Sequence, residues 1–191
     1  MATIVATPGA SNANSYETKA EADNYFANER LPLTPPWDDA SDPEVALIMA
    51  TRVLNSMATP HKTLVIRDAQ RYYLTARQWT GAPASTTQKL AWPRTGMFDR
   101  NGNAIPSTVI PQELKDAQSE LAGQLLGSDT TLDNTITVQG VSSVKAGSVS
   151  VAFKDNIATY TLPDAVWALL PPSWFTDELL TLVPNAEFDV L

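Results

Sequence analysis

Cysteine is absent from the 191 residues, and histidine occurs once, as His61. Without cysteine there is no disulfide framework and no thiolate metal site. No apolar run reaches the length of about 18 residues that a membrane-spanning helix needs. The first ten residues lack a basic stretch followed by an apolar one, so we expect no secretory signal. These absences favour assembly in the cytoplasm.

Few residues are of the types that catalysis requires. His61 lies in a polar stretch, where a Ser-His-Asp or Cys-His arrangement is not indicated. Glu113, Asp116 and Glu120 stand at helical spacing and could do acid–base work, but a solvated helix face explains them better. No calcium-loop, phosphate-loop or dinucleotide pattern is present. We therefore expect no enzyme, no catalytic residue, no cofactor and no metal.

Charge is distributed unevenly along the chain, whose formal net charge is −8. Residues 1–51 carry two basic and eight acidic residues, 52–100 carry eight basic and two acidic, and 101–191 carry three basic and eleven acidic. An acidic chain argues against nucleic acid as the main partner, because phosphate binding depends on clustered Lys and Arg. The clustering is either an accident of a solvated surface or a sign that the basic middle docks on acidic parts of a neighbouring copy.

Apolar residues recur at helical spacing in four segments. Capping-box patterns open two of them, Thr18 with Glu21 and Ser41 with Glu44. The second of these segments is the clearest amphipathic helix, and we expect it at the centre of the core. The predicted helices cover residues 18–30, 43–58, 111–126 and 163–170.

The remaining segments predict loops and strands. Residues 59–81 fit a strand and a helix about equally well, and we favour an extended excursion or hairpin. Residues 82–110 are rich in Pro and Gly and are expected to be mostly loop. Period-two alternation at 135–138, 148–153 and 157–160 predicts a hairpin or three-stranded sheet.

These patterns predict a mainly α (α+β) fold. It consists of a small helical bundle with a long loop or hairpin excursion, a small C-terminal β-hairpin or three-stranded sheet, and an extended C-terminal arm. We divide the chain into a flexible N-terminal arm (1–14), a helical core (15–130) with its excursion at about 59–110, a small β element (131–162), and a C-terminal short helix and tail (163–191).

Aromatic and basic residues alternate in the middle of the chain. Single-strand-DNA binders combine aromatic stacking platforms with basic grooves. Alternatively, the aromatics fill gaps between helices while arginines extend to solvent, or they form a protein interface rich in Trp, Tyr and Arg. We favour the core or the protein interface over DNA. The residues concerned are Tyr72, Tyr73, Trp79 and Trp92, with Arg67, Arg71, Arg77, Lys89 and Arg94 between them.

The segment Gln88-Lys-Leu-Ala-Trp-Pro-Arg-Thr-Gly96 is the most specific motif. It follows Ala13-Asn-Ser-Tyr16 and Trp79-x-Gly81 and precedes Val144-Lys-Ala-Gly147. In this order the motifs resemble tailed-bacteriophage virion proteins often labelled DnaT-like single-strand-DNA-binding proteins, which look like head-tail connector (adaptor, head-completion) subunits. The likeness covers roughly residues 12–153. The stretch 57–77 is longer than the link expected in that family.

This resemblance implies a structural subunit of a ring of about twelve copies beneath the portal of a DNA-filled head. Its implied location is the neck of the virion, after assembly in the host bacterial cytoplasm. The implied partners are copies of itself, the portal protein and further neck or tail proteins, with packaged DNA passing through the ring and no membrane. The alternative is a phage accessory protein that binds single-stranded DNA.

The candidate protein-interface residues are aromatic or basic side chains of the middle segment and the C-terminal tail. Trp92 either anchors its loop on the bundle, which we favour, or contacts a partner. Arg94 could touch a neighbour or DNA, and with two other arginines we expect it to meet acidic surface on a neighbour. The candidates are Arg71, Arg77, Trp79, Trp92, Arg94, Trp174, Phe175 and Phe188.

Overall fold

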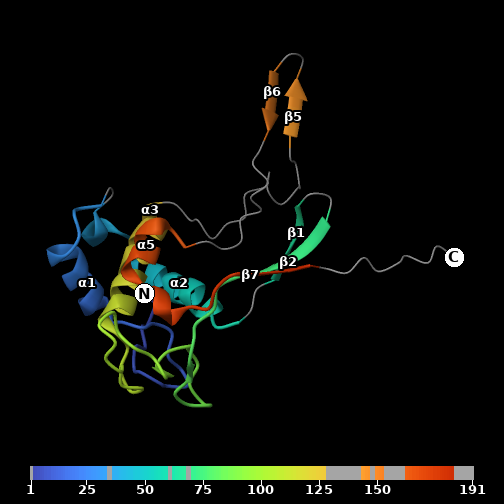
Figure 1. The fold of residues 1–191 in the computed structure, drawn as a ribbon. Coiled ribbons are helices and arrows are strands. Elements are labelled where there is room, and N and C mark those ends of the chain that lie inside the picture. The colour runs from blue at the N-terminus through green and yellow to red at the C-terminus, as the bar shows by residue number, and fades with distance from the viewer. Residues whose placement is uncertain are drawn as a thin grey trace. The chain divides into compact units, whose positions relative to one another are not determined.

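A computed structural model describes residues 2–33, 36–59, 62–67, 70–127, 143–146, 149–152 and 162–182 (Figure 1). The chain divides into two units. Unit 1 comprises Met1–Thr59, Gln78–Thr131 and Leu162–Thr176, and unit 2 comprises Pro60–Arg77, Leu132–Thr161 and Asp177–Leu191. The described parts are mainly helical with small antiparallel sheets, as the sequence predicts.

Unit 1 holds the four helices of the described residues. α3 packs against each of the other three, and Figure 1 shows it among them. The four predicted helices are confirmed, with ends that shift by one or two residues. The helices are α1 (Lys19–Asn28), α2 (Pro43–Ser56), α3 (Gln112–Gly127) and α5 (Asp164–Leu169), with 3₁₀ turns η1 (Trp37–Asp39) and η2 (Pro172–Trp174).

The two predicted capping boxes have different outcomes. At α1 the Thr18 side chain accepts a hydrogen bond from the Glu21 amide, and the Glu21 carboxylate accepts one from the Thr18 amide. The second box is wrong, because Asp42 rather than Ser41 is the N-cap of α2 and makes no side-chain capping bond. Pro43 opens that helix instead, where its missing N–H costs nothing.

The N-terminal segment is not a loose arm. The Val5 amide donates to Asn14 Oδ1 at 2.7 Å, and the Asn14 amide donates to the Val5 carbonyl at 2.9 Å. The Lys89 amide donates to the Ala10 carbonyl, and Ala13 is buried. Residues 2–14 are therefore ordered on unit 1, because the Asn14 side chain supplies the turn that a periodicity search does not detect.

The chain after α5 also differs from the expected C-terminal arm. Trp174 and Phe175 are buried in unit 1, and Phe175 forms a β-bridge with Trp79. In the loop region, β3 (Ala82–Pro83) pairs with β4 (Arg94–Thr95). The core of unit 1 thus gathers segments from both ends of the sequence around α3.

Unit 2 contains the predicted hairpin. β1 (Lys62–Arg67) pairs with β2 (Gln70–Thr75), and β2 pairs with β7 (Leu179–Leu182), so that the strand order is β1-β2-β7. β7 is a strand that the sequence did not indicate. β7 and its partner β2 are about a hundred residues apart in sequence, so local patterns cannot predict their pairing.

A second hairpin joins β5 (Ser143–Ala146) to β6 (Val149–Ala152). β6 confirms the central part of the predicted strand at 148–153. β5 lies outside the three segments in which period-two alternation predicts strands. The predicted strands 135–138 and 157–160 lie outside the described residues. Among the helices that are described, none is long and apolar enough to cross a membrane.

Gly81 and Gly96 test how tightly the loop region is packed. Both have a positive φ, +66° and +74°. A Cβ on Gly81 would lie 2.2 Å from the Thr95 carbonyl oxygen, whereas one on Gly96 meets nothing within 4 Å.

We expect Gly81→Ala to lower the free energy of unfolding by about 2–4 kcal/mol, from backbone strain and overpacking together. Gly96→Ala is the matched control and should cost about 1 kcal/mol. Urea denaturation measures both, and equal losses would contradict the close packing.

Candidate functional site

Arg94 of the Trp-Pro-Arg box is a buried tie between loop segments. Its Nε donates to the Thr80 carbonyl at 2.7 Å, and its Nη1 to the Ala91 carbonyl at 3.1 Å. Its Nη2 donates to the Gly81 carbonyl at 3.0 Å. The guanidinium fork therefore satisfies three backbone acceptors that the irregular chain path leaves without ladder partners.

The position of Arg94 corrects its expected role at an interface. The residue is only 5% exposed, and burial lowers the pKa of its guanidinium. Carbonyl dipoles surround the charge, and Arg94 is in none of the three ion pairs between described residues. Because the guanidinium of Arg94 is buried and bonded to backbone carbonyls, it is not accessible to a neighbouring copy or to a phosphate.

Four of the aromatic candidates form one cluster in the core. The ring centroids of Trp92 and Trp174 lie 4.8 Å apart, those of Trp79 and Trp92 5.6 Å, and those of Trp79 and Phe175 4.5 Å. All four residues are at most 9% exposed. They stabilise unit 1, as expected for Trp92, and are buried too deeply to act as stacking platforms or partner contacts in the folded chain.

The indole nitrogens of the three tryptophans in this cluster differ in their hydrogen bonds. Trp79 Nε1 donates to the Leu54 carbonyl at 3.0 Å, which fixes the cluster on α2. Trp174 Nε1 donates to the Phe98 carbonyl at 2.7 Å. Trp92 Nε1 is buried and has no hydrogen-bond partner among the described residues. The cluster thus binds α2, the loop around Phe98 and the chain end of unit 1 together.

The other candidates lie outside this cluster. Arg71 is in β2, opposite Ile66 of β1, and Arg77 is exposed just after β2. Phe188 lies outside the described residues. The structure therefore brings together the aromatic candidates Trp79, Trp92, Trp174 and Phe175 with Arg94, and it places Arg71 and Arg77 in unit 2.

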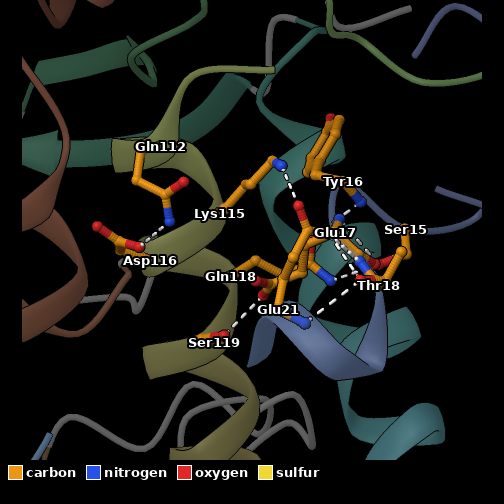
Figure 2. A network of polar contacts seen from close by, with 10 residues as sticks. All are labelled: Ser15, Tyr16, Glu17, Thr18, Glu21, Gln112, Lys115, Asp116, Gln118 and Ser119. Carbon is orange, nitrogen blue, oxygen red and sulfur yellow. Dashed lines mark hydrogen bonds and ion pairs between the residues drawn. The ribbon is translucent and has the colours of Figure 1, made fainter. Parts of the chain in front are cut away.

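A buried polar network was missed by sequence reasoning (Figure 2). Gln118 of α3 accepts from the Tyr16 amide at 2.9 Å and donates to Ser15 Oγ at 2.7 Å. Its Nε2 also donates to the Leu47 carbonyl of α2 at 3.2 Å. Ser119 Oγ donates to Glu17 Oε1 at 2.7 Å. The signal that could have indicated it is the position of Gln118, which stands at helical spacing between Leu114 and Leu121 on the apolar face of α3.

Glu17 is the electrostatic centre of the network. It is 1% exposed, and burial raises the pKa of its carboxyl from the ordinary 4.5 to about 8. The hydrogen bond from Ser119 opposes this shift, while the nearby Glu21 and Asp116 carboxylates add to it. Lys115 is the cation close to it, but its Nζ pairs with Glu21. The Glu17 carboxyl is therefore favoured in its neutral form at pH 7.

Glu120 corrects the expectation of a solvated acidic face on α3. It is 5% exposed and accepts from Arg30 Nε at 2.7 Å and from the Tyr25 hydroxyl at 3.2 Å. Burial acts to raise its pKa, but the Arg30 hydrogen bond and charge lower it below the ordinary value. This ion pair joins the end of α1 to α3. In the part of the chain that the structure describes, no group of three or more His, Asp or Glu residues could hold a metal ion.

The β1–β2 hairpin, the loop region after it and α3 fall within a range shared with known sequences. Residues 56–175 match the model of a family described as "Putative DnaT-like ssDNA binding protein". The chain belongs to this family. The matched range includes Arg94 and the aromatic cluster of this DnaT-like protein, but not Glu17. No curated protein and no solved structure matches the chain.

The role of Arg94 in this DnaT-like protein can be tested by stability. We expect Arg94→Ala to lower the free energy of unfolding by about 2–4 kcal/mol, because three carbonyls lose a charged donor. Arg52→Ala, at an exposed position of α2, is the matched control and should change it by less than about 0.5 kcal/mol. Chemical denaturation followed by tryptophan fluorescence measures both, and comparable losses would show that Arg94 is not a structural tie.

Proposed function

We propose that this chain is a non-catalytic structural subunit of a tailed-bacteriophage virion. In this proposal it is a head-to-tail adaptor that forms a ring under the portal and links the DNA-filled head to the tail. The observation that carries the proposal is the contrast in charge between residues 60–77 and unit 1. Residues 60–77 hold four basic residues and one acidic residue, whereas unit 1 holds seven basic and fourteen acidic residues.

Opposite charges on different parts of one chain suit a ring. In a ring each copy presents one face to a different face of the next copy. A hairpin segment with charge +3 and a unit with charge −7, from the counts above, are complementary between successive copies. Such complementarity guides association and suppresses wrong partners.

The burial of the aromatic cluster supports this proposal over a DNA groove. Of the tryptophans that the nucleic-acid interpretation requires, Trp79 and Trp92 are buried and hold unit 1 together. Arg94, the basic residue beside Trp92, is bonded to backbone carbonyls. Four of the remaining basic residues of the sequence fall within residues 60–77, of which Lys62 and Arg77 are exposed.

Assembly on the portal tests the adaptor function. We expect the wild-type chain to bind a purified portal ring as a closed ring seen by electron microscopy, and to occur in purified virions at about the portal copy number. Arg71→Glu combined with Arg77→Glu should abolish ring formation, because the hairpin then repels the acidic neighbour. Arg52→Glu, an exposed reversal in unit 1, is the control and should assemble normally. Unchanged assembly of the double variant would reject the basic hairpin as the contact.

Binding of single-stranded DNA is the second candidate function. It is favoured by the family match and by Tyr73 of β2, which is 43% exposed in the basic hairpin. If the chain binds DNA, affinity should fall steeply with salt. Tyr73→Ala should then weaken binding by about 1–3 kcal/mol, whereas Tyr73→Phe keeps the stacking ring and should bind normally. Fluorescence anisotropy with a labelled oligonucleotide measures this, and weak, salt-insensitive binding would favour the adaptor.

A further inference from the structure

Residues 2–17 form a strap that ends on α3. The strap is closed on itself, since the Asn14 side chain accepts from the Val5 amide and donates to the Thr3 carbonyl at 2.8 Å. Its far end is fixed by the Tyr16 amide, which donates to Gln118, and by Glu17, which accepts from Ser119. The strap is therefore held on unit 1 by the burial of Ala13 and Tyr16 in the core and, at its α3 end, by a few buried polar bonds.

Three elements meet where the strap ends. Ser15 Oγ donates to the Glu17 carbonyl at 2.6 Å and accepts from Gln118 Nε2. Gln118 also donates to the Leu47 carbonyl of α2, so that one amide side chain contacts the strap and α2 together. Figure 2 shows these side chains converging between α3 and the start of α1. Displacing any one of them would leave buried polar groups without partners.

Glu17 is the titratable group inside this junction. From α1, Glu21 faces it, and from α3, Asp116 and Lys115 face it. The strap contributes Tyr16, whose pKa is raised by burial, so that it stays neutral. Because Lys115 pairs with Glu21, an ionised Glu17 would meet two like charges and an already paired cation.

We propose that Glu17 is a proton-dependent latch, whose neutral carboxyl holds residues 2–17 on α3 and whose ionisation weakens that hold. Release of the strap would expose the Gln118 and Ser119 positions of α3, which are fully buried when it is docked. The α1 cap is separate, since Thr18 and Glu21 bond to each other. The helix can therefore persist while the strap leaves.

The direction of the pH dependence follows from the two states of Glu17. Its pKa is about 8 in the docked state and near the ordinary 4.5 when the carboxyl is in water. The docked state thus binds the proton more tightly, so docking is fully stable below 4.5 and weakens as pH rises towards 8. The release equilibrium grows about tenfold per pH unit in this window and levels off above it.

Hydrogen exchange of the full-length chain tests the latch. In the wild type, protection of the Tyr16 and Asn14 amides, corrected for intrinsic exchange, should fall about tenfold per pH unit from pH 5 to 8. Glu17→Gln keeps the shape without the charge, and protection of these amides should then be independent of pH. Glu113→Gln, a partly exposed carboxyl on α3, is the control and should behave as the wild type does. A pH-independent wild type, or equal profiles for wild type and Glu17→Gln, would overturn the proposal.

A second measurement does not depend on the folding of Glu17→Gln. The side-chain carboxyl of Glu17, followed by carbon NMR in the wild type, should titrate with a midpoint near 8. Ser119→Ala should move this midpoint upward, because the hydroxyl that donates to the carboxylate is lost. A midpoint near 4.5 in the folded wild type would reject the latch.

Discussion

Burial of α3 on almost every side is the constraint on which unit 1 depends. Gln118, Ser119 and Glu120 are consecutive and buried, although they are polar. A buried polar group without a hydrogen bond costs about 1–3 kcal/mol, so each of the three must have a partner from elsewhere in the chain. Gln118 and Ser119 fix the N-terminal strap, and Glu120 fixes the end of α1 through Arg30. The helix thus organises unit 1 through its polar positions as much as through its apolar ones.

The loop region also depends on a buried polar side chain, but here the side chain is the basic donor Arg94 and its partners are backbone carbonyls. Residues 78–111 contain only two short strands, so many of their carbonyls lack ladder partners. Arg94 satisfies three of these carbonyls, and the surrounding tryptophans exclude water from them. The Trp-Pro-Arg box is therefore a folding device of this DnaT-like protein. Any partner is expected at surfaces that the core does not use.

Those surfaces are the acidic exterior of unit 1 and the basic hairpin of unit 2. The adaptor proposal uses both in one contact between successive copies, and the DNA-binding alternative uses only the hairpin. The Glu17 latch is independent of either function, because it depends on contacts inside unit 1. Membership of the DnaT-like family is consistent with both functions, since the matched residues 56–175 include the hairpin and the buried box alike.

The sequence by itself determined the helices and the uneven charge, and it favoured the β1–β2 hairpin over a helix without deciding between them. Each depends on residues that are close along the chain, such as the capping pair Thr18 and Glu21. Only the tertiary structure decided that Arg94, Glu17 and Glu120 are buried, because these residue types are exposed in most proteins. Their burial depends on partners far away in sequence: Glu17 and Ser119 are 102 residues apart. No local pattern encodes such a contact, nor the burial that raises the pKa of Glu17.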